Sequence, residues 1–150
     1  MMITYRKACF TDEEIAQLIA LSKDWVDEDI SFGMVTNTRD NIHEPLILAL
    51  DAERIVGYIM GKFFIEEKKR SYIDIGDKCF EVEELYVTPR YRNQGIGKML
   101  FSLMEKEVKD QVKYIVLSTS TKDYQKALNF YAGKNEMIFH DAFLFKKTRG

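Results

Sequence analysis

The feature that most constrains this chain is the stretch YVTPRYRNQGIGKML, residues 86–100. An apolar run typical of a strand ends at a proline, and a basic turn with two glycines leads into apolar residues at helical spacing. A strand that passes through Gly95 and Gly97 into a helix predicts a layered α/β or α+β fold. The turn either only punctuates the chain or lets a phosphate approach the backbone.

Two common phosphate-binding motifs do not fit this turn. A P-loop needs G-x-x-x-x-G-K-[S/T], but Met99 follows Lys98, and Arg92 occupies the position of the early glycine. A dinucleotide fingerprint needs G-x-G-x-x-G/A, but Leu100 occupies the last small position. Besides an ordinary turn, this leaves an anion site at a helix start, where unpaired N–H groups and the helix dipole attract negative charge. Arg90, Arg92 and Lys98 add positive charge, which favours a diphosphate.

The rest of the chain alternates between strand and helix patterns. Thr11 with Glu14 forms a capping-box pattern, and Pro45 ends an irregular segment that contains a short second helix. Strands are expected at residues 2–8, 46–50, 55–65, 79–87 and 114–119, helices at 11–25, 97–111 and 122–134, and a closing strand or hairpin at 137–147. This order predicts hairpins in the middle of the chain and a parallel strand–helix–strand crossover after them.

Composition narrows the class of protein. Residues 1–150 fit one domain, and 46% apolar residues predict a packed core. A net charge of −2 argues against a nucleic-acid-binding surface, and no run approaches the length of a membrane span or a signal peptide. Cys9 and Cys79 are too few for a disulfide framework and predict reduced thiols in a cytoplasmic protein. His43 and His140 are isolated from any carboxylate pattern, so no metal site is predicted.

Residues 92–97, RNQGIG, resemble the [Q/R]-x-x-G-x-[G/A] motif of the GNAT superfamily of N-acetyltransferases. The flanking segments ELYVTPRYR and KMLFSLME also resemble that family, and the order of elements is similar over nearly the whole chain. The resemblance implies a GNAT acyl-CoA N-acyltransferase fold, with a mixed central sheet of about six to seven strands flanked by about four helices. It also implies an enzyme that uses acetyl-CoA as donor and needs no metal.

The resemblance further implies which residues bind acetyl-CoA. Backbone N–H groups of the turn would hold the pyrophosphate, and the end of the preceding strand would pair with the pantetheine arm. Lys134 would meet the 3′-phosphate or be solvated, and Tyr124 replaces an asparagine that relatives use on the pantetheine. The predicted coenzyme-binding residues are Leu85, Tyr86, Val87, Arg92, Asn93, Gln94, Gly95, Ile96, Gly97, Lys98 and Lys134.

Candidate catalytic residues lie on both sides of the turn. Strand alternation in FEVEELYV predicts Glu81 and Glu83 on one face and Glu84 on the other. A carboxylate could take the proton that an amine must lose before it attacks a thioester, or these residues simply face solvent. Resemblance to polyamine-type members implies Glu83 as the first candidate base and Glu81 as the second. It implies Tyr131 as the acid that protonates the leaving thiolate, although an aromatic residue beside Phe130 is equally typical of a core.

The acceptor is predicted from the acidic segment KDWVDEDISF. Asp27 and Glu28, together with Glu83, would bind a cationic amine, or the acids belong to a solvated loop. The expected reaction is direct acetyl transfer to a primary amine of a small cationic molecule, such as a polyamine or an aminoglycoside. The alternatives are a protein N-terminal or lysine acetyltransferase and a non-catalytic acetyl-CoA-binding sensor. The apolar segment AFLFKK allows a homodimer, and no nucleic-acid or membrane partner is expected.

Overall fold

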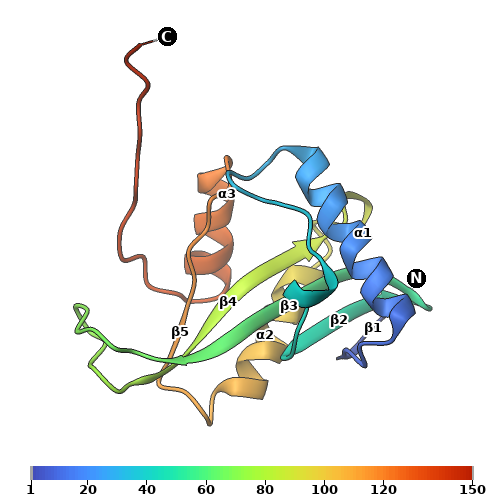
Figure 1. The fold of residues 1–150 in the computed structure, drawn as a ribbon, viewed down its shortest axis with the longest axis horizontal. Coiled ribbons are helices and arrows are strands. Elements are labelled where there is room, and N and C mark those ends of the chain that lie inside the picture. The colour runs from blue at the N-terminus through green and yellow to red at the C-terminus, as the bar shows by residue number, and fades with distance from the viewer. Residues whose placement is uncertain (1, 150) are drawn as a thin grey trace.

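A mixed sheet of five strands forms the centre of the computed structural model, which describes residues 2–149 (Figure 1). The strands are β1 (Ile3–Lys7), β2 (Leu46–Asp51), β3 (Arg54–Ile65), β4 (Lys78–Val87) and β5 (Tyr114–Val116), and they lie side by side in that order. The first four pair antiparallel, whereas β5 runs parallel to β4. The predicted hairpins and the final parallel crossover are therefore confirmed.

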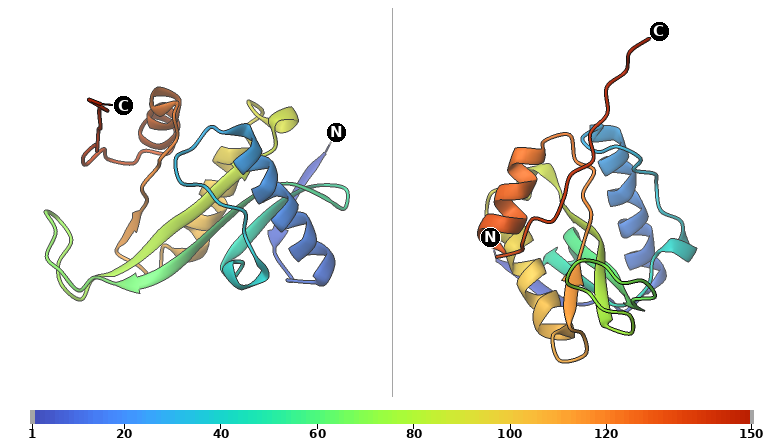
Figure 2. Two further views of the ribbon diagram at one scale, coloured as in Figure 1. Left: turned by 45° about the horizontal axis from the view of Figure 1, so that its top comes forward. Right: turned by 90° about the vertical axis from the view of Figure 1, so that its left-hand side faces the viewer.

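Helices cover both faces of the sheet. On one face lies α1 (Asp12–Glu28); on the other lie α2 (Ile96–Val108) and α3 (Tyr124–Leu128), which continues as a π-helical segment, Asn129–Lys134 (Figures 1 and 2). Single 3₁₀ turns occur at Arg39–Asn41 and Pro89–Tyr91. The Thr11 hydroxyl caps α1 by accepting a hydrogen bond from the Glu14 N–H at 3.1 Å.

Two apolar cores result, one on each face, because successive residues of a strand point to opposite sides. The core under α2 contains Val56, Ile59, Phe80, Val82, Leu100 and Met104, all buried. The core under α1 contains Ile15, Leu18, Leu48, Tyr58, Met60 and Tyr86. Strands β3 and β4 contribute to both cores, so their positions are fixed from both sides.

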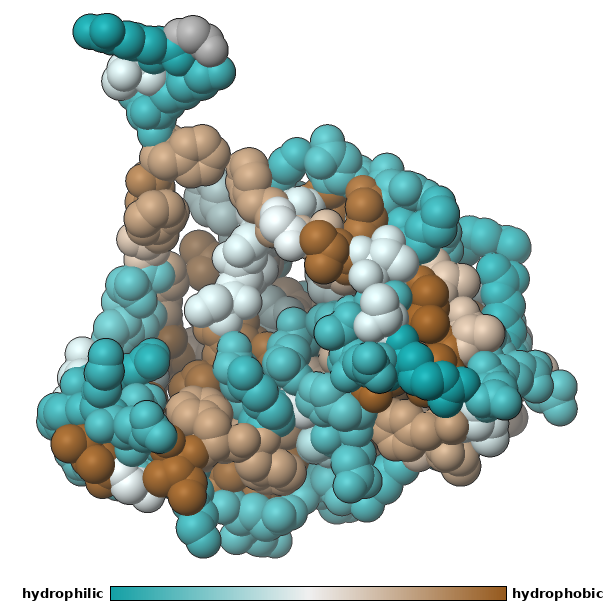
Figure 3. Space-filling view, in the orientation of Figure 1, coloured by the Kyte–Doolittle hydropathy of each residue, from teal (hydrophilic) through white to brown (hydrophobic). Residues whose placement is uncertain are grey.

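The closing strand expected at residues 137–147 is not formed, so the described chain has five strands where six to seven were predicted. Residues 135–149 form no ladder, and the last of them extend away from the body (Figures 1 and 3). Ile138, Phe143 and Leu144 are 94%, 93% and 82% exposed. Their apolar character favours a strand, but a strand also needs a hydrogen-bonding partner, which a local pattern does not identify.

Gly61 of β3 marks the closest approach within the sheet. A Cβ atom added there would lie 2.3 Å from the Glu81 carbonyl oxygen and 2.4 Å from a ring carbon of Phe80. We therefore expect Gly61→Ala to lower the free energy of unfolding by about 2 kcal/mol or more, measured by urea denaturation. Gly133→Ala is the matched control, because a Cβ there meets no atom within 4 Å. Equal losses in the two variants would contradict this packing.

Candidate active site

Strand β4 has a neighbouring strand on both sides only in its first half. It pairs with β5 only over Cys79–Glu81, while its pairing with β3 continues to Val87. On the β5 side, the backbone of residues 82–87 therefore has no strand partner in the described chain. The residues predicted to pair with pantetheine, 85–87, lie on this open edge.

The turn after β4 has a backbone suited to an anion. Asn93 and Gly95 have φ angles of 62° and 85°, and Gly95 caps α2 without a side-chain hydrogen bond to the first N–H groups. A Cβ on Gly95 would meet no atom within 4 Å, but one on Gly97 would lie 3.3 Å from the Phe130 ring. Gly95 thus provides the left-handed conformation, and Gly97 makes room for an aromatic ring of the π-helical segment.

The two lysines predicted at the coenzyme site meet beside this turn. Lys98 Nζ donates to the backbone oxygen of Lys134 at 2.6 Å. The side chain of Gln94, another predicted coenzyme contact, donates to the Arg90 carbonyl at 3.2 Å. The end of the π-helical segment therefore lies against the start of α2, and it brings Tyr131 to the same side of the sheet.

The Arg92 side chain joins the turn to α1. Its Nε donates to the Val87 carbonyl at 2.8 Å, and its Nη1 and Nη2 donate to the two Glu28 carboxylate oxygens at 2.7 and 2.9 Å. The Tyr86 hydroxyl also donates to Glu28, and the guanidinium lies 5.4 Å from the Tyr86 ring centroid. A predicted coenzyme residue and a predicted acceptor residue therefore neutralise each other in a half-buried ion pair.

The other acids at the end of α1 also have cationic partners. Asp27 pairs with Lys23 at 2.9 Å, and Asp29 pairs with Lys122 at 2.9 Å, with the carboxylates exposed to solvent. Burial by itself would raise the pKa of Glu28, but hydrogen bonds from Arg92 and Tyr86 and the Arg92 charge lower it below its ordinary value. Glu28 is thus ionised at neutral pH and held in place.

A β-bulge in β4 changes where its carboxylates point. Met60 of β3 faces Glu84, and the next residue, Gly61, faces Val82, so Glu83 has no opposite residue. Val82 packs in the core under α2, whereas Glu84 accepts a hydrogen bond from Tyr58, which lies in the core under α1. The prediction that Glu84 lies on the face opposite Glu83 is therefore wrong, because the extra residue resets the alternation.

Glu81, Glu83 and Glu84 have different neighbours on the α1 side. The Glu84 oxygen Oε1 accepts hydrogen bonds from the Tyr58 hydroxyl at 2.6 Å and from Asn37 Nδ2 at 2.8 Å. Burial and the Glu84 charge raise the pKa of Tyr58. Glu81 is 3.8 Å from Lys62 Nζ, a weak contact between partly exposed groups. Glu84 therefore has a structural role, because it holds Tyr58 and Asn37, and Glu83 is the carboxylate at the bulge.

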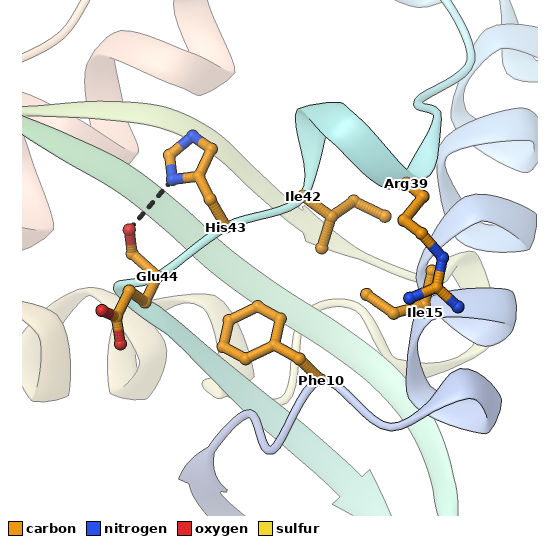
Figure 4. A pocket seen from close by; sticks show the side chains of 6 residues that line it. All are labelled: Phe10, Ile15, Arg39, Ile42, His43 and Glu44. Carbon is orange, nitrogen blue, oxygen red and sulfur yellow. Dashed lines mark hydrogen bonds between the residues drawn. The ribbon is translucent and has the colours of Figure 1, made fainter.

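His43 is the residue that the sequence did not reveal, because it lies far from Glu83 along the chain. Its Nε2 is 2.9 Å from Glu83 Oε1, so the expectation that it is isolated from carboxylates is wrong. His43 also borders a pocket of about 260 Å³ lined by Phe10, Ile15, Arg39, Ile42, His43 and Glu44 (Figure 4). In Figure 4 the apolar side chains form the middle of this pocket, with Arg39 and Glu44 towards its ends.

Tyr131 lies on the other face of the sheet. Its ring packs against Phe101 and Phe130, with ring centroids 6.2 and 4.9 Å apart, in the core that also contacts Leu85 and Val87. Burial raises the pKa of Tyr131 to about 12, so the hydroxyl is neutral at physiological pH and has a proton to donate. The candidate base and acid therefore flank β4 from opposite faces.

The described chain offers no site for a bound metal ion. Within residues 2–149, no three His, Cys, Asp or Glu side chains are close enough together to hold one. Over the same residues, no helix is both long and apolar enough to cross a membrane. Cys9 is exposed and Cys79 is buried, and both are free thiols.

Residues 6–134 match the model of the acetyltransferase (GNAT) family. Because this match spans most of the chain, the chain belongs to that family, whose members transfer acyl groups from acyl-CoA. The family resemblance read from RNQGIG and acetyl-CoA as the donor are thereby confirmed. A search of curated proteins finds no match to the chain.

Solved structures of the same fold include three instructive examples. An aminoglycoside acetyltransferase from an uncultured soil metagenomic sample has a TM-score of 0.70 and 13% identity, covering 100% of both chains. A predicted acetyltransferase from Clostridium acetobutylicum, solved with acetyl-CoA, has a TM-score of 0.69 and 20% identity, covering 97% of this chain and 96% of its own. A ribosomal-protein-alanine N-acetyltransferase from Brucella melitensis has a TM-score of 0.68 and 12% identity, covering 99% of this chain and 100% of its own. The TM-scores establish a shared fold, and identities this low establish nothing beyond it. The predicted fold class is thereby confirmed.

The Glu28–Arg92 pair leads to a test of stability against pH. We expect Glu28→Gln to lower the free energy of unfolding at pH 7 by about 2 kcal/mol, because Arg92 loses its charged partner. The folded-state pKa of Glu28 is lowered, so its contribution is present above the unfolded-state pKa, about 4.3, and is lost as the pH falls below it. The difference between wild type and variant, measured by urea denaturation, should therefore shrink below about pH 4. Asp27→Asn, at an exposed pair, is the control and should change little.

Proposed function

We propose that this protein transfers the acetyl group of acetyl-CoA directly to a primary amine of a small cationic molecule, such as a polyamine or an aminoglycoside. The observation that carries the proposal is that Glu83 and Glu84 both lie on the α1 side of β4, where that strand has no β5 partner. Acidic groups beside the donor site favour a cationic acceptor. Asp27 and Glu28, at the end of α1, add to the acidic character of the same side, although each is paired.

The donor site in this proposal is the open β4 edge with the turn that follows it. The coenzyme's pyrophosphate occupies the first N–H groups of α2, where Gly95 leaves space, and the pantetheine arm pairs with residues 85–87. Lys98 and Lys134, which lie together, supply positive charge for the coenzyme's phosphates. The Arg92 side chain supports the turn through Glu28 and Val87 instead of contacting the coenzyme.

Glu83 is the proposed base and Tyr131 the proposed acid. An amine is mostly protonated near neutral pH, so Glu83 removes a proton before the nitrogen attacks the thioester carbon. As the C–S bond breaks, the Tyr131 hydroxyl gives its proton to the departing sulfur, and the proton that the new amide nitrogen loses restores the hydroxyl. Burial raises the pKa of Tyr131, so its hydroxyl still carries a proton when the thiolate departs.

Two other functions remain as competing candidates. The chain shares its fold with a ribosomal-protein-alanine N-acetyltransferase, and a protein N-terminus or a lysine is also an amine acceptor. A sensor that binds acetyl-CoA without transferring it would keep the turn but have no use for a base at the bulge. A single domain acting in the cytoplasm, with both cysteines reduced, is consistent with all three.

The experiment is a thiol-release assay with acetyl-CoA against polyamines, aminoglycosides, amino acids and peptides. We expect turnover with a polycationic small amine and a fall of about 100-fold in kcat for Glu83→Gln, with acetyl-CoA affinity kept within about twofold. Glu81→Gln, at the second candidate base, should lower kcat less than Glu83→Gln does. Tyr131→Phe should also lower kcat because it removes the proton but keeps the packing. An unchanged Glu83→Gln rate would remove Glu83 from the role of base. Tight coenzyme binding without turnover on any amine would favour the sensor.

We also propose that two copies of the chain associate through residues 137–145. This segment exposes five large apolar side chains, Ile138, Phe139, Phe143, Leu144 and Phe145, and exposed apolar groups of this kind are typical of interaction surfaces. A second copy offers both apolar cover and a strand partner for the unpaired backbone. We expect a dimer in size-exclusion chromatography with light scattering, and a monomer for the double variant Phe143→Asp, Leu144→Asp. Val35→Asp, at an exposed apolar residue elsewhere, should remain dimeric, and a monomeric wild type would contradict the proposal.

A further inference from the structure

The His43 ring lies between two oxygen acceptors. Its Nδ1 is 2.9 Å from the Glu44 carbonyl oxygen, and its Nε2 is 2.9 Å from Glu83 Oε1 (Figure 4 shows the first contact). A carbonyl and an ionised carboxylate accept hydrogen bonds but do not donate them. Because an ionised carboxylate can only accept, Nε2 of His43 must carry the hydrogen of its contact with Glu83.

His140 provides an internal comparison. Its Nδ1 is 2.8 Å from Asp141 Oδ1, and its Nε2 is 2.9 Å from the Ser71 hydroxyl. A hydroxyl can donate as well as accept, so the Ser71 contact does not require a hydrogen on Nε2 of His140. The two histidines of the chain therefore differ in one respect: His43 must donate from Nε2 to keep its carboxylate contact, and His140 need not.

The segment that carries His43 is fixed at both ends. Ile42 and Leu46, on either side of it, are buried in the core under α1. Earlier in the same segment, the Asn37 N–H donates to Ser22 Oγ at 2.9 Å, and its side chain donates to Glu84. The segment thus reaches β4 at two neighbouring carboxylates, Glu83 and Glu84.

Glu83 needs such support more than its neighbours do. It is the bulged residue, with no residue opposite it on β3, and a glutamate side chain has several rotatable bonds. Glu84, by contrast, is held by two hydrogen bonds. The His43 contact uses one oxygen of Glu83, so the other oxygen, Oε2, is available to an acceptor amine.

We propose that His43 is the positioning residue for Glu83: its Nε2–H holds Oε1 and thereby orients Oε2 toward the acceptor amine. This inference rests on the proposed function, in which Glu83 is the base. It assigns a role in the same site to residues 33–45, for which the sequence predicted no function. His43 acts through Glu83 and does not itself exchange a proton with the substrate.

The test compares two amides at position 43. The amide nitrogen of glutamine takes the place of Nε2 and can still donate to Glu83, whereas that of asparagine takes the place of Nδ1 and can donate only to the Glu44 carbonyl. We expect His43→Gln to keep kcat within about threefold of wild type and His43→Asn to lose about tenfold or more. The KM for acetyl-CoA should be unchanged in both, since the turn before α2 is remote from His43. A role in holding the loop alone predicts the reverse order, with asparagine the better substitute, and that order would overturn the proposal.

A measurement without substrate separates this inference from the proposed function. In ¹H–¹⁵N spectra of the ligand-free protein, Glu83→Ala should shift the Nε2 resonance of His43 and leave both His140 nitrogens unchanged. His43→Gln assigns the resonances, because the chain has two histidines. If the His43 resonance does not respond, the contact is absent and the inference fails, whatever the enzyme acetylates. If it responds but Glu83→Gln keeps full activity, the contact stands and the assignment of Glu83 as base fails.

Discussion

The unequal pairing of β4 is the constraint on which the rest of the structure depends. The strand is bonded along its length to β3 but to β5 over only three residue pairs, Cys79 to Glu81. An open strand edge has unpaired N–H and C=O groups, and these can pair with an extended molecule. An extended molecule with alternating amide groups, such as the pantetheine arm of coenzyme A, is such a partner. The turn with Gly95 and the start of α2 follow directly at the end of that edge, where the coenzyme's phosphates would lie.

The second determinant is a single extra residue in the same strand. Without the bulge, regular alternation would send either Glu83 or Glu84 into the apolar core under α2, where an unpaired carboxylate is strongly unfavourable. With the bulge, Phe80 and Val82 stay in that core, while Glu83 and Glu84 both find polar partners on the α1 side, His43 for the first and Tyr58 with Asn37 for the second. Gly61 makes this possible, because any side chain there would collide with the bulged strand.

Local patterns predicted local structure well. The strands around residues 55–65 and 79–87, the two long helices, the crossover and the GNAT turn follow from hydrophobic period, caps and glycines, which act over a few residues. What the sequence did not predict involves partners distant along the chain. The bulge depends on how β3 meets β4, the contact of His43 with Glu83 depends on the path of a loop, and Arg92 bonds to Glu28 instead of facing the turn's ligand. The strand predicted at residues 137–147 is absent for a related reason. The apolar pattern there is that of a strand, but the pattern does not identify the strand with which it would pair.

The ion pair between Arg92 and Glu28 has a consequence for how the two substrates affect each other. It connects the turn that precedes α2 with the end of α1, which under the proposed function belong to the donor side and the acceptor side. If one ligand tightens or loosens this link, the affinity for the other ligand changes by the same factor in both directions, because binding free energies around a closed cycle must agree. The order in which donor and acceptor bind therefore cannot alter the total coupling free energy. Under the proposed function, Arg92 is the residue through which the two ligands would be coupled.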